Sequence, residues 1–381
     1  MKNSNKMILF ALALFTIAGA AAAHFTGASP VVMPLAFAAV GVGLPVAARK
    51  LNLSTPFAML MVTTTLTTTA VRASYGGYYA DNSKNTKDLY TKQFQAAEFD
   101  TLFKMVKTDL TVYRKALVTS TATTQQFQLA WTPNGSYTFT PSPIPLQGIK
   151  VDQELSSYDV MDEWVGFLHE QGKSQAEQPL AKYILENLLL PQHIEDIELN
   201  GCYFGVQGVV TPGAAGSVGA MMDGVKKVIN DAYGAGTISP ISVGAIPTDP
   251  EDYVDYVMAF GQGIDSKDRK RPMTLAVSLD REYLFKQGME SKYNTQYKSA
   301  EDIARVKLQD NITVKGFAAM GTSDKMFCTP DGNAVKPVNM GKGPLWQFEV
   351  VDRRLKVWTD HWMGYGFIDH GRVYTNPEEL S

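Results

Sequence analysis

The sequence predicts an α+β fold, with helices in the middle of the chain and strands toward its end. Segments with helix caps and one apolar face recur between residues 156 and 293, whereas short strand-like segments dominate the C-terminal part. A turn signal at Asn134-Gly135 separates two runs of alternating polarity. A chain of 381 residues can hold two or three domains, or one large domain with an arm.

The N-terminal segment differs in composition from the rest of the chain. It contains three apolar runs, at residues 7–23, 31–48 and 56–71, and no acidic residue precedes Asp81. The first run has the basic start, apolar centre and small-residue end of an export signal, but such a signal explains only that run. The first two runs also have the length of a short membrane hairpin. The segment is therefore an export signal, a membrane hairpin or an apolar arm that serves assembly.

A β-hairpin is the clearest local prediction. Apolar and polar side chains alternate over residues 126–131 and 136–140, and Asn134-Gly135 favours the positive φ values of a tight turn. Residues 141–145 contain three prolines and cannot form a central strand. We expect this hairpin to project from the body of the protein.

Two helices are predicted after the hairpin. Ser156 begins a capping box, and Gly172 is placed to end the first helix. Pro179 is placed at the start of the second helix, and Pro191 is expected to end it. These signals predict a helical region over residues 158–190 with a break near Gly172.

The remaining elements follow from the same signals. Residues 198–210 are predicted to be extended, and an amphipathic helix should follow and end at Gly234. Asp249 and Pro250 should begin another helix. The other expected elements are a helix at 87–99, a strand at 273–278, a helix at 280–293, and strands at 312–317, 326–329, 345–351, 354–362 and 372–375.

No residue pattern predicts a catalytic, cofactor or metal site. Two Asp-His pairs, at 360–361 and 369–370, are candidates for acid–base or metal chemistry, but no third ligand accompanies them. Cys202 and Cys328 match no zinc or redox spacing, and we expect two buried free thiols rather than a disulfide. The net charge of −3 gives no indication of nucleic-acid binding. We therefore expect a protein that is not an enzyme and that has no cofactor.

The order of these parts resembles the major capsid proteins of tailed bacteriophages, which have the Hong Kong 97 type of fold. Residues 125–147 look like the extended loop of that family, and residues 158–190 look like its spine region. The turn SDKMFCTP and the aromatic, glycine-rich stretch from Trp362 to Gly366 are similar to the closing part of capsid proteins from Bacteroidetes phages. The resemblance covers residues 86–378 and implies the α+β capsid fold.

The resemblance also implies a division of the chain. The six expected parts are an apolar N-terminal segment 1–75, an N-terminal arm 76–120, an extended hairpin loop 121–150, a spine helix and peripheral domain 151–200, an axial domain with flanks 201–344, and a return to the peripheral domain 345–381. Members of the family often carry a charged, helical scaffolding segment at the N-terminus. The apolar segment of this chain departs from that pattern, and we expect it to be removed during maturation or kept as an arm.

The implied function is that of a structural subunit of an icosahedral phage head, made in the host cytoplasm and located in the virion. Its implied partners are further copies in hexamers and pentamers, the portal and other head proteins, DNA by non-specific proximity, and a membrane through the N-terminal segment. The residues expected to contact neighbouring subunits are Phe127, Leu129, Trp131, Tyr137 and Phe139 in the loop, and Trp164 and Leu168 in the spine.

The alternative function is that of an exported or membrane-anchored binding protein of a bacterial envelope. The first apolar run would then be its signal sequence, and Cys202 could pair with Cys328. The second apolar run favours the capsid interpretation, because a secreted binding protein has no use for it.

Overall fold

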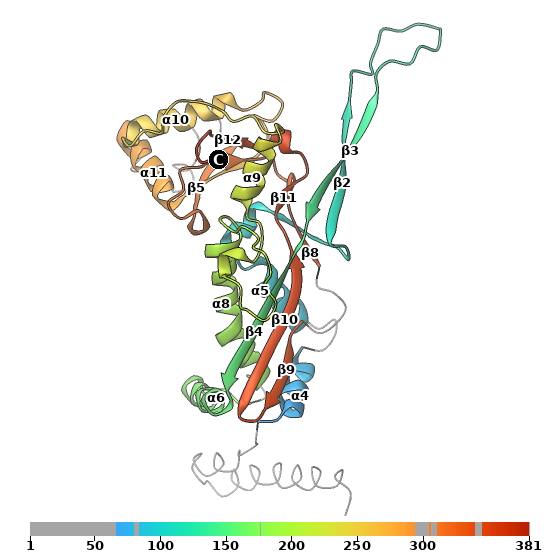
Figure 1. Ribbon diagram of the computed structural model, residues 1–381. Coiled ribbons are helices and arrows are strands. Elements are labelled where there is room, and N and C mark those ends of the chain that lie inside the picture. The colour runs from blue at the N-terminus through green and yellow to red at the C-terminus, as the bar shows by residue number, and fades with distance from the viewer. Residues whose placement is uncertain are drawn as a thin grey trace, which may run out of the picture. The chain divides into compact units, whose positions relative to one another are not determined.

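A computed structural model describes residues 66–79, 84–175, 177–293, 305, 311–339 and 345–380 of the chain. The chain divides into two units, Met1–Thr65 and Leu66–Ser381, and the first unit lies outside the described residues. The first two apolar runs and most of the third therefore lie outside them as well. Among the residues that are described, no helix is long and apolar enough to cross a membrane. All elements named below belong to the second unit (Figure 1).

Two long antiparallel strands dominate a six-stranded sheet (Figure 1). Strand β4 (Gln147–Ser156) pairs with β10 (Arg354–Met363) along its whole length, and β9 (Gln347–Val351) pairs with the other side of β10. The turn between β9 and β10 places Asp352 at φ 54°, a conformation that aspartate tolerates better than most residues. Alternate residues of β10, from Leu355 to Met363, are buried, so one face of the sheet covers a core.

The rest of this sheet comes from distant parts of the chain. Strand β1 (Lys104–Lys107) runs parallel to β8 (Ala334–Asn339), and β8 also pairs with the end of β10 and with β11 (Gly366–Phe367). Pro337 lies inside β8 opposite the gap between β10 and β11, where its carbonyl accepts a hydrogen bond from the Gly364 N–H. Pro337 has no N–H, so it contributes only this acceptor at this point of the sheet.

Four helices pack against the part of this sheet that β9 and β10 form. They are α4 (Thr68–Tyr78), α6 (Ser157–Gln171), α7 (Leu180–Tyr183) and α8 (Leu190–Asp196). The α6 prediction is confirmed at both ends: the Ser156 hydroxyl accepts from the Asp159 N–H, and Gly172 ends the helix at φ 60°. Leu355 and Val357 of β10 pack with these helices in one buried cluster.

The prediction that Pro191 ends the second helix is wrong. The helix starts at Leu180, after Pro179 as predicted, and continues through Pro191 to Gly201 by way of π-helical turns at Ile184–Leu189 and Ile197–Gly201. In the first π turn, Leu190 N–H bonds to the Leu185 carbonyl, which is five residues earlier. This wider turn makes room for the proline ring, which would clash in a regular α-helix.

A second, four-stranded sheet carries two helices on the other part of this unit (Figure 1). Its strands, in spatial order, are β12 (Tyr374–Thr375), β7 (Phe327–Cys328), β5 (Met273–Ser278) and β6 (Ile312–Phe317), and its helices are α10 (Pro250–Gly263) and α11 (Leu279–Tyr293). The predicted cap of α10 is confirmed, since the Asp249 carboxylate accepts from the N–H groups of Glu251 and Asp252. Gly288 lets the two helices approach closely, because a Cβ there would lie 2.0 Å from the Pro250 carbonyl oxygen.

A third group of elements packs an aromatic core between the sheets. It includes α5 (Lys84–Gln95), a 3₁₀ turn at Glu98–Leu102 and α9 (Val225–Gly234). The buried aromatic side chains of this core include Phe94, Phe99, Phe103, Tyr203, Phe317, Phe327, Tyr365 and Phe367. The extended segment predicted at 198–210 is wrong: its start is helical, and the rest forms turns and a loop outside any strand. Leu199 and the residues around it were misread because the helix carries on past its proline.

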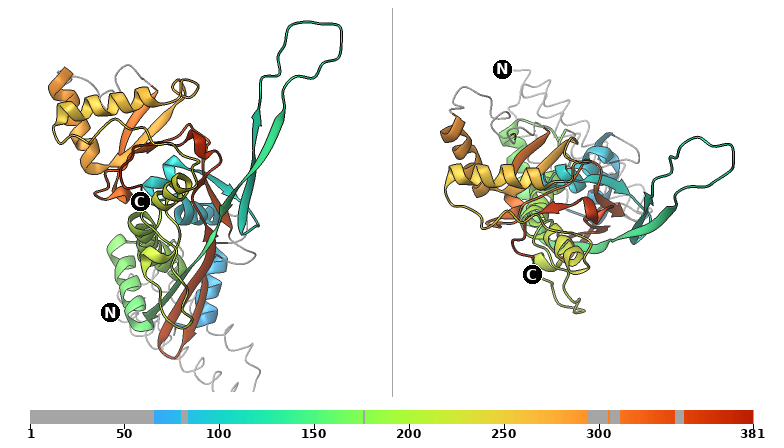
Figure 2. Two further views of the ribbon diagram at one scale, coloured as in Figure 1. Left: turned by 45° about the horizontal axis from the view of Figure 1, so that its top comes forward. Right: turned by 90° about the horizontal axis from the view of Figure 1, so that it is seen from above.

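The predicted hairpin exists, but its first strand was misplaced. Strand β2 (Val112–Ser120) pairs with β3 (Tyr137–Pro145), with Ser120 opposite Tyr137 and Val112 opposite Pro145. Residues 121–136, called the ribbon tip below, form a loop between the strands, so the predicted strand at 126–131 is wrong. Figures 1 and 2 show this two-stranded ribbon extending away from the other described elements of its unit.

The three prolines of β3 all lie on its outer edge. The Thr121 N–H donates to the Ser136 carbonyl, and hydrogen-bonded pairs recur at every second residue along the ribbon. Pro141, Pro143 and Pro145 belong to the pairs in between, so their backbone nitrogens face away from β2. Without N–H groups, these positions cannot donate to a further strand. The outer edge of β3 is thereby protected from chance pairing with another chain, in agreement with the prediction that it is not a central strand.

Candidate interaction surface

The ribbon tip exposes large hydrophobic side chains. Phe127, Leu129 and Trp131 are 89%, 95% and 92% exposed, and Tyr137 and Phe139 of β3 are also more than half exposed. The resemblance to capsid proteins predicted these five as contact residues. The residues between them at 126–130 are exposed as well, so the alternation does not mark a strand with one buried face. The structure tests their exposure and leaves their role as contacts a prediction.

Local hydrogen bonds hold the ribbon tip in its conformation. The Thr121 N–H donates to the Ser136 carbonyl at 3.0 Å, and Gln125 Nε2 donates to the Thr132 carbonyl at 2.6 Å. Gly135 adopts φ 83°, the positive value that the Asn-Gly pair predicted. The apolar side chains of the tip are therefore carried by a loop whose two ends are hydrogen-bonded to each other.

The sequence around this surface carries no charge. Between Lys115 and Lys150, no Asp, Glu, Lys or Arg occurs. Burying such a surface against a partner would leave no charged group without a counter-charge. Exposed aromatic side chains gathered in this way are typical of interaction sites rather than of free protein surface.

The two predicted contact residues of the spine lie elsewhere. Trp164 and Leu168 of α6 are each 6% exposed and belong to the buried cluster under the six-stranded sheet. The Trp164 indole N–H donates to the Gln178 carbonyl at 3.0 Å, which fixes the chain after α6. Because both side chains pack within the subunit, they offer little surface to a neighbour. The sequence pattern of one apolar helix face did not distinguish an internal core from an interface.

A buried ion pair lies at the centre of the aromatic core. Lys336 Nζ is 2.7 Å from Asp100 Oδ2 and donates to the Phe94 carbonyl at 2.8 Å, while the Tyr365 hydroxyl donates to Asp100 Oδ1 at 2.6 Å. Both charged side chains are almost completely buried. Sequence reasoning missed this group, because nothing in the strand sequence AVKPVN marks Lys336 as buried.

Two histidines pack beside this ion pair. The rings of His193 on α8 and His361 on β10 meet edge to face with centroids 5.2 Å apart. Burial lowers the pKa of His193 to about 4, and burial together with the neighbouring His193 and Lys336 lowers the pKa of His361 to about 3. Both rings are therefore neutral at pH 7.

The Asp-His pairs do not form a site. Asp360 is exposed and His361 is buried, because successive residues of β10 point to opposite faces of the sheet. Asp369 accepts a hydrogen bond from the Gly371 N–H and so serves the local turn. Among the described residues, no three His, Cys, Asp or Glu side chains are grouped so that they could hold a metal ion.

The two cysteines are free and buried, as expected. Burial raises the pKa of both thiols above its usual range. The disulfide that the envelope alternative allowed is absent, so Cys202 and Cys328 give that alternative no support.

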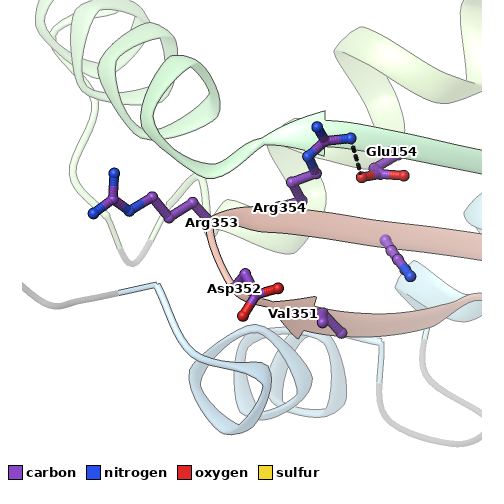
Figure 3. A pocket seen from close by; sticks show the side chains of 6 residues that line it. Glu154, Val351, Asp352, Arg353 and Arg354 are labelled. Atoms are coloured by element: carbon purple, nitrogen blue, oxygen red, sulfur yellow. Dashed lines mark hydrogen bonds and ion pairs between the residues drawn. The ribbon is translucent and has the colours of Figure 1, made fainter.

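A shallow depression lies at the end of the β9–β10 hairpin (Figure 3). Its lining is mostly charged: Arg354 Nη1 lies 2.6 Å from Glu154 Oε1, and Arg353 points away from this pair. Small-molecule sites are usually enclosed and largely apolar. This depression has neither property, so the ribbon tip remains the strongest candidate surface of the described chain.

Comparison with known proteins places the fold. No family model matches the sequence, and no curated protein matches it either. Among solved structures, a chain of the satellite phage P4 procapsid, which includes its size determination protein, matches with a TM-score of 0.52 at 14% identity, over 77% of this chain and 90% of that chain. The capsid of cyanophage P-SCSP1u matches with a TM-score of 0.42 at 9% identity, over 74% of this chain and 88% of that one.

A virus-like particle from Pyrococcus furiosus matches with a TM-score of 0.40 at 12% identity, over 76% of this chain and 96% of that one. Of these three similarities, the first is the one that carries the fold assignment. The predicted relation to Bacteroidetes phages stays a prediction. The chain has the Hong Kong 97 type of fold found in phage capsid proteins.

Proposed function

We propose that this chain is the structural subunit of a tailed-phage head, and that copies of it assemble into a closed icosahedral shell around the genome. The observation that carries the proposal is the ribbon tip, which exposes Phe127, Leu129 and Trp131 on a fold shared with a phage procapsid chain. These side chains contribute nothing to the core of their own subunit. An exposed apolar surface of this kind promotes aggregation of a monomeric protein, whereas a protein that assembles buries it against further copies of itself.

The parts of the fold support distinct tasks in such a shell. The β2–β3 ribbon is proposed to be the extended loop, and because β2 belongs to it, this loop begins at Val112 rather than at residue 121. The remaining assignments are kept as a proposal: the spine and peripheral domain at 151–200, the axial domain with flanks at 201–344 and the return at 345–381. The strand β8 at 334–339 pairs within the six-stranded sheet, so the 201–344 segment contributes to both sheets.

The proposed role needs no catalytic chemistry. Subunits would meet through exposed apolar side chains, and large aromatic residues are the ones that contribute most to such contacts. Each contact is modest, but a closed shell repeats it in every subunit. The portal and other head proteins, and DNA through non-specific proximity, remain proposed partners, as does a membrane for the N-terminal segment.

Size measurement of the full chain tests this function. The purified protein, of 41.8 kDa per chain, is analysed by gel filtration with light scattering and by negative-stain electron microscopy over a range of concentrations. We expect closed shells, tubes, or rings of five or six subunits. A protein that stays monomeric at every concentration would overturn the proposal.

A further inference from the structure

The two buried histidines carry ring nitrogens that no group of the described protein pairs. His193 Nε2 and both ring nitrogens of His361 are buried and have no hydrogen-bond partner among the described residues. His193 is 5% exposed and His361 is 1% exposed, so neither ring reaches the solvent outside. A neutral imidazole has one N–H donor and one acceptor nitrogen, so His361 leaves one of each to be satisfied. Nearly all buried polar groups in folded proteins are paired, either with protein or with ordered water.

Three elements meet around these nitrogens. The rings of His193 on α8 and His361 on β10 lie edge to face with centroids 5.2 Å apart, and the ring of Phe94 on α5 meets His361 in the same way, also at 5.2 Å. These ring contacts supply dispersion but no hydrogen bond to the nitrogens. The junction of α5, α8 and β10 therefore holds donors and acceptors within an aromatic surrounding.

Gln93 adds polar groups on the same buried face of α5. It precedes Phe94, is 2% exposed, and has no hydrogen-bond partner for either its Nε2 or its Oε1. Eleven buried side-chain atoms of the described residues have no such partner, and five of these atoms belong to Gln93, His193 and His361. Atoms gathered in this way indicate one ligand that they share.

The charges nearby select the class of ligand. Lys336 Nζ is 2.7 Å from Asp100 Oδ2, so this buried ion pair is neutral as a unit. Burial, together with the charge of Lys336, lowers the pKa of both histidines and keeps their rings neutral at pH 7. A buried ion at the junction would therefore have no counter-charge of its own, which is costly.

The unpaired atoms also require a ligand that both donates and accepts. The imidazoles and the amide each offer donors and acceptors. Water meets this requirement, and a buried water typically makes two to four hydrogen bonds to polar groups that would otherwise be unsatisfied. A neutral molecule of this size also adds no charge to the core.

We infer that Gln93, His193 and His361 form a buried water-binding site at the junction of α5, α8 and β10. Ordered water bridges the ring nitrogens and the amide, and so links by hydrogen bonds three elements that are distant in the sequence. The inference concerns the interior of one subunit and goes beyond the proposed function, on which it does not depend. It also accounts for two histidines and a glutamine among aromatic side chains.

A high-resolution density map of the full chain tests the inference. The map comes from crystals, or from electron microscopy of particles, at neutral pH and at a resolution that shows ordered water. We expect a peak about 2.7–3.2 Å from a ring nitrogen of His361 and from His193 Nε2. The variant His361→Phe keeps a ring but removes both nitrogens, and the peak should be lost. The exposed His169 supplies the control, since His169→Gln should keep the peak.

The outcomes separate water from the other arrangements. A wild-type map without a peak, in which the ring nitrogens bond directly to Gln93 or to each other, would overturn the inference. A peak about 2.0–2.1 Å from the imidazole nitrogens would be a metal ion and would overturn it as well. A peak that persists unchanged in His361→Phe would show that this histidine does not hold the water. A chain that forms no particles would contradict the shell function, whereas its crystals would still test the site.

Discussion

The ribbon tip and the buried ion pair place side chains in opposite environments: apolar groups in solvent and charged groups in the core. At the tip, apolar rings lie in solvent without a partner in their own subunit. In the core, Lys336 and Asp100 lie out of solvent, with every charge matched by a hydrogen bond. Each arrangement is costly alone, and each is tolerable because something compensates it. The compensation for the ion pair is inside the subunit, whereas the compensation for the tip has to come from outside.

The largest effect on stability is expected from Lys336→Met. The substitution removes the cation and leaves the Asp100 carboxylate buried without its partner, which typically costs about 3–5 kcal/mol. Urea unfolding, followed by circular dichroism at a protein concentration below that of assembly, measures the change. A loss below about 1 kcal/mol would mean that the carboxylate reaches water in solution. The exposed pair Lys150–Asp152 is the control, and Lys150→Met should leave the midpoint unchanged.

Acid should weaken the same core through its histidines. In the unfolded chain a histidine has a pKa near 6.5, whereas burial lowers the pKa of His193 to about 4 and that of His361 to about 3. Between these values the unfolded chain binds protons that the folded chain excludes, so stability is complete above pH 6.5 and falls as the pH decreases. We expect a loss of about 2 kcal/mol per histidine between pH 7 and pH 5.

A substitution isolates this contribution from that of other groups. The variant His361→Gln should lose less stability than the wild type between pH 7 and pH 5, when both are unfolded with urea at each pH. His169 on α6 lies on the exposed side of its helix, and His169→Gln should keep the wild-type slope. Equal slopes in all three proteins would contradict the assignment of the acid sensitivity to the buried pair.

A smaller effect is expected at a helix end remote from both regions. Asp249→Ala removes the side chain that accepts from the Glu251 and Asp252 N–H groups at the start of α10. Loss of such a cap typically costs about 1 kcal/mol. The same urea experiment measures it, with Asp249→Asn as the variant that retains a capping oxygen and most of the stability. An Asp249→Ala protein as stable as the wild type would show that α10 is held by its packing on α11 alone.

Local signals predicted much of the fold. Ser156, Gly172, Asp249 and Pro250 act through neighbours within a few residues, and the helices they delimit lie where expected. Long-range pairing was not predictable in this way. Strand β2 has exposed residues on both faces, so the alternation that marks a half-buried strand is missing from its sequence. The effect of Pro191 was wrongly predicted because a π-helical turn just before it lets the helix continue, and the sequence gives no signal for such a turn.

The candidate surface was predictable in part for a related reason. Aromatic residues without charged neighbours are visible in the sequence of the ribbon tip, although their alternation suggested the wrong secondary structure. Trp164 and Leu168 show the same apolar character and are nevertheless buried in their own subunit. Exposure, which separates these cases, depends on tertiary contacts.

The measurement that tests the central claim most directly compares the size and the stability of a ribbon-tip variant with those of the wild type. The triple change Phe127→Ser/Leu129→Ser/Trp131→Ser removes the apolar side chains of the ribbon tip, and Tyr283→Ser on α11 is its matched surface control. Both proteins and the wild type are examined by sedimentation velocity and by urea unfolding. We predict that the triple variant keeps the wild-type unfolding midpoint but sediments as a monomer, while the control assembles normally. A triple variant that unfolds early, or that assembles as well as the wild type, would contradict a ribbon tip whose partner lies outside its own subunit.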